Sequence, residues 1–240
     1  MKVAALLTGR GNNTLKDKNI LDVLGHPVLY YPARAGKDSV MVDHWYCSSD
    51  DEKILRIAEA MGYARIQRPD ELASPTAQHV DAILHGLQVM EQRDGYVPDV
   101  VVVILANNVT IKAEWIDDCI RAMQEDPSLS SVIPVYEDND HHPLRAKTVN
   151  SDGMMTMYEK GITGKVSTNR QDLPLCCFPA HNFWVLRREA VLNHEEGQQP
   201  WGFMGNRIKP YFIDESIDIH HSVDLLLAKE WLTSHSPEVL

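Results

Sequence analysis

Residues 100–105 form an unbroken run of aliphatic, mostly β-branched side chains, Val-Val-Val-Val-Ile-Leu. Such a run has no polar face, so it is typical of a strand that is buried on both sides. Strands of this kind occur in parallel sheets, because the crossover helices of these sheets cover both faces. The run therefore predicts an α/β fold.

Strand and helix patterns alternate on both sides of this run. Further strands are predicted at residues 2–7, 40–47, 64–67, 131–135, 183–186 and 208–213. Helices are predicted at residues 27–35, 51–61, 77–92, 113–125, 187–194 and 222–234. Pro27 is expected to start the first of these helices and Gly36 to stop it. The order predicts a Rossmann-like, doubly wound and mostly parallel sheet.

The alternation of strands and helices breaks down between residues 137 and 177. Short extended segments and polar loops stand there, and they have few obvious partners elsewhere in the chain. We therefore expect one domain over residues 1–240, from which residues 137–177 emerge as an excursion.

The charge and hydropathy of the chain limit its partners. A formal net charge of −11 disfavours nucleic acid and anionic membranes as general partners, but it leaves room for a local basic pocket. No apolar run approaches the roughly 20 residues that span a bilayer, and the first apolar run is too short for a signal peptide. The sequence predicts a cytoplasmic protein that binds neither nucleic acid nor membranes.

The loop after the first predicted strand, residues 7–19, is rich in glycine, asparagine and cations. Gly9 and Gly11 let a backbone approach a phosphate closely, and successive N–H groups as far as Asn13 can form an anion-binding concavity. Positive charge comes from Arg10, Lys16 and Lys18. Neither the Walker pattern nor Gly-x-Gly-x-x-Gly is present, and an ordinary turn is the alternative interpretation.

Small or polar residues also follow two other predicted strands, at Ser49-Asp50 and at residues 106–108. Ligands of doubly wound sheets bind at the carboxyl ends of the strands. The loop at residues 7–19 and these two segments are therefore expected to form one binding rim.

Several short motifs occur in an order that resembles one enzyme family. They are Lys18-Asn19, Ser48-Ser49-Asp50-Asp51, Arg68-Pro69-Asp70-Glu71-Leu72-Ala73, His141-His142-Pro143, Arg170-Gln171-Asp172-Leu173-Pro174, and Ser216-Ile217-Asp218-Ile219 with Asp224-Leu225. Together they resemble, over nearly the whole chain, the CMP-sialic acid synthetase (acylneuraminate cytidylyltransferase) family.

The resemblance implies a fold of the nucleotide-diphospho-sugar transferase type and a homodimer, with residues 137–177 as the dimerisation excursion. It also implies that the anomeric hydroxyl of a sialic-acid-like 2-keto-3-deoxy acid attacks the α-phosphate of CTP. The products are the CMP-sugar, a precursor of cell-surface polysaccharide, and pyrophosphate, with Mg²⁺ or Mn²⁺ as cofactor.

The resemblance further implies roles for individual residues. The expected catalytic residues are Arg10, Lys18 and Asp218, and the expected metal ligands are Asp218 and His220. The residues expected to contact CTP are Leu7, Gly9, Arg10, Gly11, Asn12, Asn19, Asp50 and Arg68. Those expected to contact the acidic sugar are Asn107, His142, Arg170, Gln171 and Asn182. Arg170 and Gln171 are expected to reach the site of a neighbouring subunit, where arginine matches a carboxylate.

Structural roles are the alternatives for two of these residues. Asp218 is placed to cap the helix predicted at residues 222–234, and Arg68 can pair with Asp70 or Glu71 as a clasp.

The chain departs from the family pattern at three places. Asn12 and Asn13 stand where the family has Ser-Lys-Gly, and residues 106–112 replace its Gln-Pro-Thr-Ser-Pro-Leu-Arg. His220 replaces an aspartate, and imidazole is a poor ligand for Mg²⁺. Two alternatives stay open: a related nucleotidyltransferase with another acid acceptor or another nucleotide, and a non-catalytic nucleotide-binding homologue.

Overall fold

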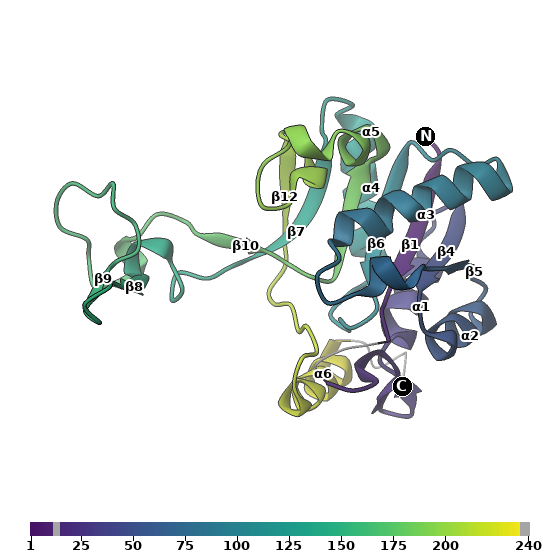
Figure 1. Cartoon of the computed structure of the whole chain (residues 1–240), viewed down its shortest axis with the longest axis horizontal. Helices are drawn as coiled ribbons and strands as arrows, with labels where there is room; N and C mark the ends of the chain where they lie inside the picture. Colours follow the sequence, from purple (N-terminus) through teal and green to yellow (C-terminus); the bar gives the residue numbers. More distant parts are fainter. Residues whose placement is uncertain (12–14, 236–240) are drawn as a thin grey trace.

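A computed structural model describes residues 1–11 and 15–235 of the chain. Within them an 8-stranded sheet lies between helices (Figure 1). Its strands are β1 (Val3–Thr8), β4 (His44–Ser49), β5 (Ala64–Gln67), β6 (Val100–Leu105), β7 (Ser131–Glu137), β10 (Cys177–Pro179), β11 (Phe183–Arg187) and β12 (Ile208–Phe212). The helices are α1 (Tyr30–Asp38), α2 (Glu52–Ala60), α3 (His79–Asp94), α4 (Ala113–Glu125), α5 (Arg188–Leu192) and α6 (Ser222–His235).

The sheet is mostly parallel, which confirms the predicted fold class. Its strand order is β10-β7-β11-β6-β1-β4-β5, and β12 pairs with β7. The strand β1 pairs in parallel with β4 and β6, whereas β11 runs antiparallel between β6 and β7. All six residues of β6 are buried, as their unbroken aliphatic run predicts.

Helices cover both faces of the sheet. Alternate residues of β1, such as Ala5 and Leu7, pack in one core with α1, α2 and α4. Their neighbours, such as Leu6, pack in a second core with α3 and α5. This two-sided burial leaves the carboxyl ends of the strands as the place where polar side chains converge.

A third apolar cluster fixes the segment that precedes α6. Ile217 and Ile219 are buried with Trp231 of α6 and with Val23 of the short strand β2 (Asp22–Val23), which pairs with β3 (His26–Pro27). Because these two isoleucines are buried, the side chain of Asp218 between them is directed away from this cluster.

Two predicted boundaries near the start of the chain are wrong. The first helix spans Tyr30–Asp38, so it begins after Pro27 and continues through Gly36. A Cβ on Gly36 would lie 2.5 Å from Oη of Tyr63 and 2.7 Å from Cδ1 of Ile104, so this glycine serves close helix–sheet packing and does not end the helix. The second strand begins at His44 and not at Val40, which lies outside the sheet and is 86% exposed.

Replacing Gly36 by alanine is expected to destabilise the protein by about 1–3 kcal/mol, because the added methyl group overpacks this contact. Thermal unfolding would then fall by several degrees. Gly161→Ala is the matched control, since its Cβ would meet only the flexible side chain of Glu159, at 3.3 Å. Equal unfolding temperatures for both variants would contradict the packing role of Gly36.

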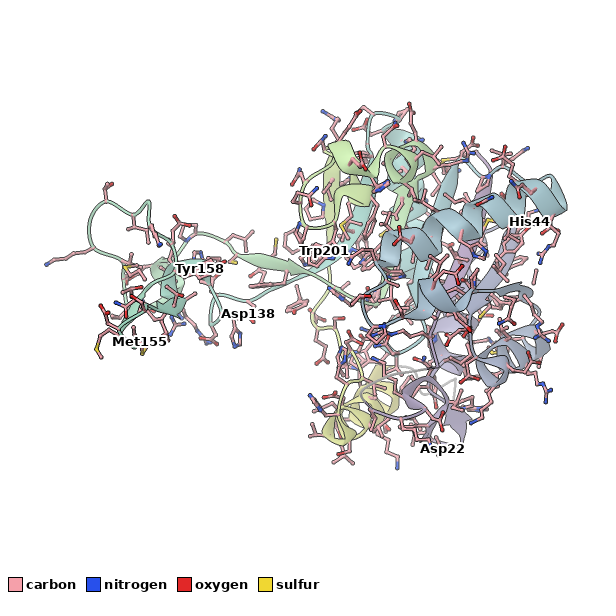
Figure 2. All side chains as sticks on the ribbon, viewed as in Figure 1. Asp22, His44, Asp138, Met155, Tyr158 and Trp201 are labelled. Atoms are coloured by element: carbon pink, nitrogen blue, oxygen red, sulfur yellow. The ribbon has the colours of Figure 1, made fainter. Side chains whose placement is uncertain are left out.

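The segment between Glu137, where β7 ends, and Cys177, where β10 begins, projects from the body as an arm (Figure 1). It carries a small antiparallel sheet of β8 (Lys147–Val149) and β9 (Met155–Met157). Figure 2 places Met155 and Tyr158 on the arm, away from the body that carries Trp201. Apolar side chains are exposed on the arm, among them Val149 (66%), Met154 (61%), Met155 (71%) and Tyr158 (65%).

Among the helices of the described residues, none combines the length and the apolar character needed to cross a bilayer.

Candidate active site

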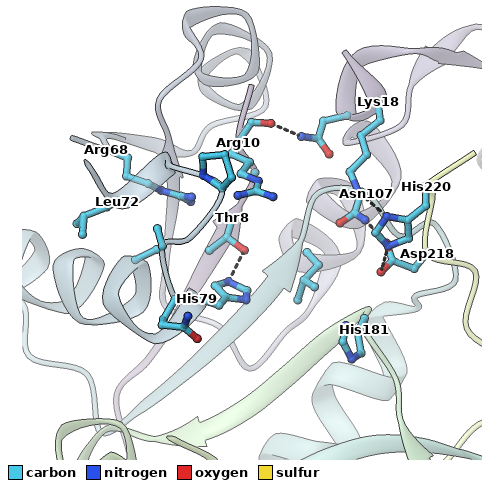
Figure 3. Close-up of a pocket in the computed structure, with 17 residues that line it drawn as sticks. Thr8, Arg10, Lys18, Arg68, Leu72, His79, Asn107, His181, Asp218 and His220 are labelled. Carbon is cyan, nitrogen blue, oxygen red and sulfur yellow. Dashed lines mark hydrogen bonds and ion pairs between the residues drawn. The ribbon is translucent and has the colours of Figure 1, made fainter. Parts of the chain in front are cut away.

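A cavity of about 360 Å³ lies at the carboxyl ends of β1 and β6 (Figure 3). Three groups of residues line it. The basic group follows β1, and the polar group comes from the segments after β6 and before α6. The apolar group comes from the short helix η2 (Asp70–Ala73) and the start of α3.

The basic group contains Arg10 and Lys18, which the loop after β1 brings to the cavity. The side-chain amide of Asn19 donates to the carbonyl of Arg10 at 3.0 Å, and Nη1 of Arg10 donates to the carbonyl of Ser74, also at 3.0 Å. The backbone N–H of Gly11 donates to the Asp50 carboxylate at 3.0 Å. These bonds fix the loop and place its cations at the cavity.

Lys18 is 7% exposed, which is unusual for an ammonium group. Burial lowers its pKa, and the charge of Asp218 partly opposes this effect. A buried cation that lines a cavity at strand ends is well suited to bind an anion there.

A chain of hydrogen bonds connects Lys18 to the polar group. Nζ of Lys18 lies 3.5 Å from Nδ1 of His220, and Nε2 of His220 lies 2.9 Å from Oδ2 of Asp218. The amide of Asn107 donates to the other oxygen of Asp218. Because an ammonium can only donate, His220 accepts at Nδ1 and donates from Nε2 to the carboxylate.

The backbone holds Asp218 beside the end of β6. Asn108 and Asp218 form an isolated β-bridge, and the N–H of Ile219 donates to the carbonyl of Asn107 at 3.0 Å. The start of α6 is instead capped by Asp224, which accepts from the N–H groups of His220 and His221 at 2.8 and 2.7 Å. Capping is therefore not the role of the Asp218 carboxylate.

Leu72, Pro75, Ala77 and Ala82 line the apolar part of the cavity, and Arg68 and His79 are its polar members. Arg68 is 5% exposed and donates to the hydroxyl and the carbonyl of Ser48, at 3.1 and 2.7 Å. It therefore pairs with neither Asp70 nor Glu71, which were the partners of the predicted clasp. Burial and the charge of Arg68 lower the pKa of His79 to about 3, so its ring is neutral.

The profile of the cytidylyltransferase family matches residues 9–160, which include the basic group of the cavity and η2. The chain belongs to this cytidylyltransferase family.

Two curated relatives bear specific names. The N-acylneuraminate cytidylyltransferase of Escherichia coli O18:K1:H7 is 30% identical over 96 residues, which are 40% of this chain and 23% of that protein. The pseudaminic acid cytidylyltransferase of Campylobacter jejuni is 28% identical over 96 residues, which are 39% of this chain and 41% of that protein. The matched part is thus less than half of each relative.

Solved structures support the fold over nearly the whole chain. A CMP:2-keto-3-deoxy-manno-octonic acid synthetase in complex with CTP aligns with a TM-score of 0.71 at 13% identity, covering 98% of this chain and 99% of that one. A 4-diphosphocytidyl-2C-methyl-D-erythritol synthase from Anaerococcus prevotii aligns with a TM-score of 0.65 at 13% identity, covering 97% and 96%.

The structure of this member of the cytidylyltransferase family brings most of the predicted catalytic, nucleotide and metal residues together. Those that line the cavity are Gly9, Arg10, Lys18, Asn19, Arg68, Asp218 and His220. Asn107, which was predicted to contact the acidic sugar, lines it as well. Gly11 and Asp50 lie just behind, bonded to each other, while Lys16 is exposed and does not line the cavity. Leu7 is fully buried inside β1, and Asn12 lies outside the described residues.

The residues predicted to contact the acidic sugar are spread over the molecule. Asn182 is fully buried behind the cavity, where its amide donates to the carbonyl of Thr110 at 2.9 Å. His142, Arg170 and Gln171 lie on the arm, outside the cavity of their own chain. Nη1 of Arg170 lies 2.6 Å from the Asp140 carboxylate, and the ring of His142 caps a short helix by accepting from the N–H of Leu144 at 3.0 Å.

Several residues that line the cavity were not predicted as site residues, among them Thr8, His79 and His181. Thr8 ends β1, so the rule that places ligands at strand ends could have included it. His79 and His181 belong to no recognised motif.

Among residues 1–11 and 15–235, no group of three or more His, Cys, Asp or Glu side chains could hold a metal ion. Asp218 fits Mg²⁺ as a single oxygen ligand, because Mg²⁺ is often held by one carboxylate plus substrate phosphates and waters. His220 does not fit, since Nε2 contacts Asp218 and Nδ1 contacts Lys18.

Proposed function

We propose that this protein transfers CMP from CTP to the anomeric hydroxyl of an acidic sugar, a sialic-acid-like 2-keto-3-deoxy acid, and releases pyrophosphate. One observation carries the proposal. The buried Lys18 and the half-buried Arg10 line the same cavity as Asp218, at the strand ends of a cytidylyltransferase fold. The names of the two curated relatives support an acidic sugar as the acceptor. Because CTP is made in the cytoplasm, we place the reaction there.

In this proposal the chain positions the reactants and stabilises charge. A bond forms between the hydroxyl oxygen of the sugar and the α-phosphorus, the bond to pyrophosphate breaks, and the proton of the hydroxyl is released to water. Negative charge grows on the phosphate oxygens, and Arg10 and Lys18 stabilise it by electrostatic attraction. The hydrogen-bond chain through His220 fixes where the ammonium of Lys18 lies.

We further propose Mg²⁺, or Mn²⁺, as the cofactor, held by Asp218 together with the triphosphate. When bound, such an ion neutralises phosphate charge and makes pyrophosphate a better leaving group.

Pyrophosphate release tests the function. The purified protein would be assayed with CTP and a panel of acids that includes N-acetylneuraminic, pseudaminic and 2-keto-3-deoxyoctonic acid, with Mg²⁺ and with Mn²⁺. We expect turnover with at least one nine-carbon acid, and mass spectrometry of the CMP-sugar identifies the product. CTP binding without turnover on any acid would instead favour the non-catalytic homologue.

We also propose that the arm dimerises the protein. Exposed apolar side chains such as Met155 and Tyr158 support a buried interface on the arm, and the exposed Arg170 (59% for its side chain) supports a role beyond its own chain. In the dimer, Arg170 and Gln171 would bind the carboxylate of the sugar in the partner's cavity.

A mixed-dimer experiment tests this assignment. Arg170→Met and Lys18→Met are each expected to be inactive with a dimeric mass in light scattering. Co-expression restores roughly a quarter of the activity, because half of the random dimers then contain one site with both residues intact. Lys160→Met, an exposed change on the same arm, is the control. A monomeric mass, or no restoration, would remove Arg170 from the site.

A further inference from the structure

His79 reaches from the first residue of α3 to the end of β1 (Figure 3). Its Nε2 lies 3.1 Å from Oγ1 of Thr8, and the same hydroxyl lies 3.3 Å from the carbonyl oxygen of Ile104. A carbonyl cannot donate, so the single hydroxyl proton of Thr8 points to Ile104. Nε2 of His79 must therefore carry the proton of the neutral ring.

This arrangement leaves Nδ1 of His79 unprotonated. Within residues 1–11 and 15–235 no hydrogen bond to this atom is formed, and His79 is one of the residues that line the cavity. The ring packs against Trp184, with centroids 5.2 Å apart, which restricts its rotation. Nδ1 of His79 is thus a hydrogen-bond acceptor at the cavity, because the contact with Thr8 keeps the ring proton on Nε2.

The surroundings of His79 suit a planar, amphipathic group. Leu72, Pro75 and Ala77 give this part of the cavity an apolar lining. The guanidinium of Arg68, held through its Nε and Nη2 by Ser48, adds a fixed set of donors. An apolar slot with one acceptor and one donor group matches a heteroaromatic ring that has both kinds of group on its edge.

We propose that His79, oriented by Thr8, selects a pyrimidine with an exocyclic amino group at the nucleotide site. Cytosine presents an amino donor beside ring nitrogen and carbonyl acceptors, so Nδ1 accepts from the amino group while Arg68 donates to an acceptor. Uracil presents a carbonyl oxygen in place of the amino group, so a lone pair of this oxygen would face the lone pair on Nδ1 of His79. The inference rests on the proposed function and names the residue that reads the base.

Two changes in the protonation of His79 would let it donate to uracil, and both are unfavourable. Protonating Nδ1 would create a charged imidazole next to Arg68 in a desolvated place, which the low pKa of His79 opposes. Exchanging the ring tautomer would turn the hydroxyl proton of Thr8 away from Ile104 and leave that carbonyl without this bond. Selection by an acceptor that is oriented before the ligand binds is typically strong, because the wrong partner leaves this acceptor unpaired once the base covers it.

Three variants of the full-length protein test the inference through kcat/KM and Kd for CTP and for UTP. The wild-type protein is expected to prefer CTP by about 100-fold or more, since a missing hydrogen bond to a buried polar group costs that much in selectivity. His79→Phe keeps an aromatic ring and removes the acceptor. The preference for CTP over UTP is therefore expected to fall to about 3-fold, mainly because the affinity for CTP decreases. His79→Gln can still present an acceptor and is expected to keep most of the preference.

Thr8→Val leaves His79 in place but removes the partner that orients its proton, so it is the test of the positioning role. We expect Thr8→Val to reduce the preference for CTP over UTP, measured as the ratio of the two Kd values, while the unfolding temperature stays within a few degrees of the wild type. If His79→Phe and Thr8→Val both keep the wild-type ratio in the Kd measurements, the inference is overturned. If the protein binds CTP more tightly than UTP but turns over no acid, the proposed function is wrong and the role of His79 still holds, because base selection is measured by binding.

Discussion

Lys18→Met is expected to lower kcat/KM for CTP by about 10²–10³-fold, equivalent to about 3–4 kcal/mol of transition-state stabilisation. The methylene stem of methionine fills the same space, so the loss is that of a buried positive charge at the phosphates. Steady-state pyrophosphate release at saturating acid gives the number.

The same variant is not expected to lose stability. Burial lowers the pKa of Lys18 in the folded protein below its unfolded value, so carrying the charge in the native state at neutral pH costs free energy. This cost shrinks as pH rises through the folded pKa, since the native lysine then releases its proton. The unfolding temperature of Lys18→Met at pH 7 should therefore equal or exceed that of the wild type.

Lys229→Met, on the exposed side of α6, is the control for Lys18. It should change neither turnover nor stability. If Lys18→Met retained CTP turnover within about 3-fold of the wild type, the assignment of the basic group to the triphosphate would fail.

Asp218→Asn is expected to lower kcat by about 10²–10³-fold while the fold is retained. A carboxylate accepts from both Asn107 and His220, whereas an amide has one oxygen and one NH₂ group. The amide oxygen could therefore accept from only one of these two donors, and the pKa of Lys18 would fall further because the opposing charge of Asp218 is lost. The variant therefore disturbs the metal ligand and the phosphate cation together.

Measurement of kcat over a range of Mg²⁺ and Mn²⁺ concentrations separates these two effects. A metal role predicts that a higher metal concentration recovers part of the rate, and circular dichroism checks the fold. Asp214→Asn, an exposed change in the segment before Ser216, should leave both rate and metal dependence unaltered. Wild-type kcat in Asp218→Asn would remove this residue from the proposed mechanism.

The sequence predicted the parts of this structure that depend on local pattern. The aliphatic run of residues 100–105 required burial on both faces, and β6 occupies that place in the sheet. The rule of strand ends brought together Gly9, Asn107 and the loop with Lys18, although more than eighty positions separate the two strands. Pattern sufficed here because a parallel sheet gathers its carboxyl ends at one edge.

Features that depend on tertiary contacts could not be predicted from the sequence. Gly36 has the character of a helix stop, and only the proximity of Tyr63 and Ile104 explains why the helix passes through it. The bond between Thr8 and His79 joins residues 71 positions apart, on two elements whose relative placement no motif encodes. The Lys18–His220 contact spans 202 positions, so an aspartate-to-histidine change could be noticed but its partner could not be predicted.

The position of β11 bears on how the chain acquires its structure during synthesis. This strand inserts between β6 and β7, so residues 183–187 must leave the ribosome before β7 can join the strands already made. Until then β6 presents an unpaired apolar edge, which is prone to wrong association. The first 137 residues therefore cannot complete the sheet as a nascent fragment, and both halves of the chain gain their stability together.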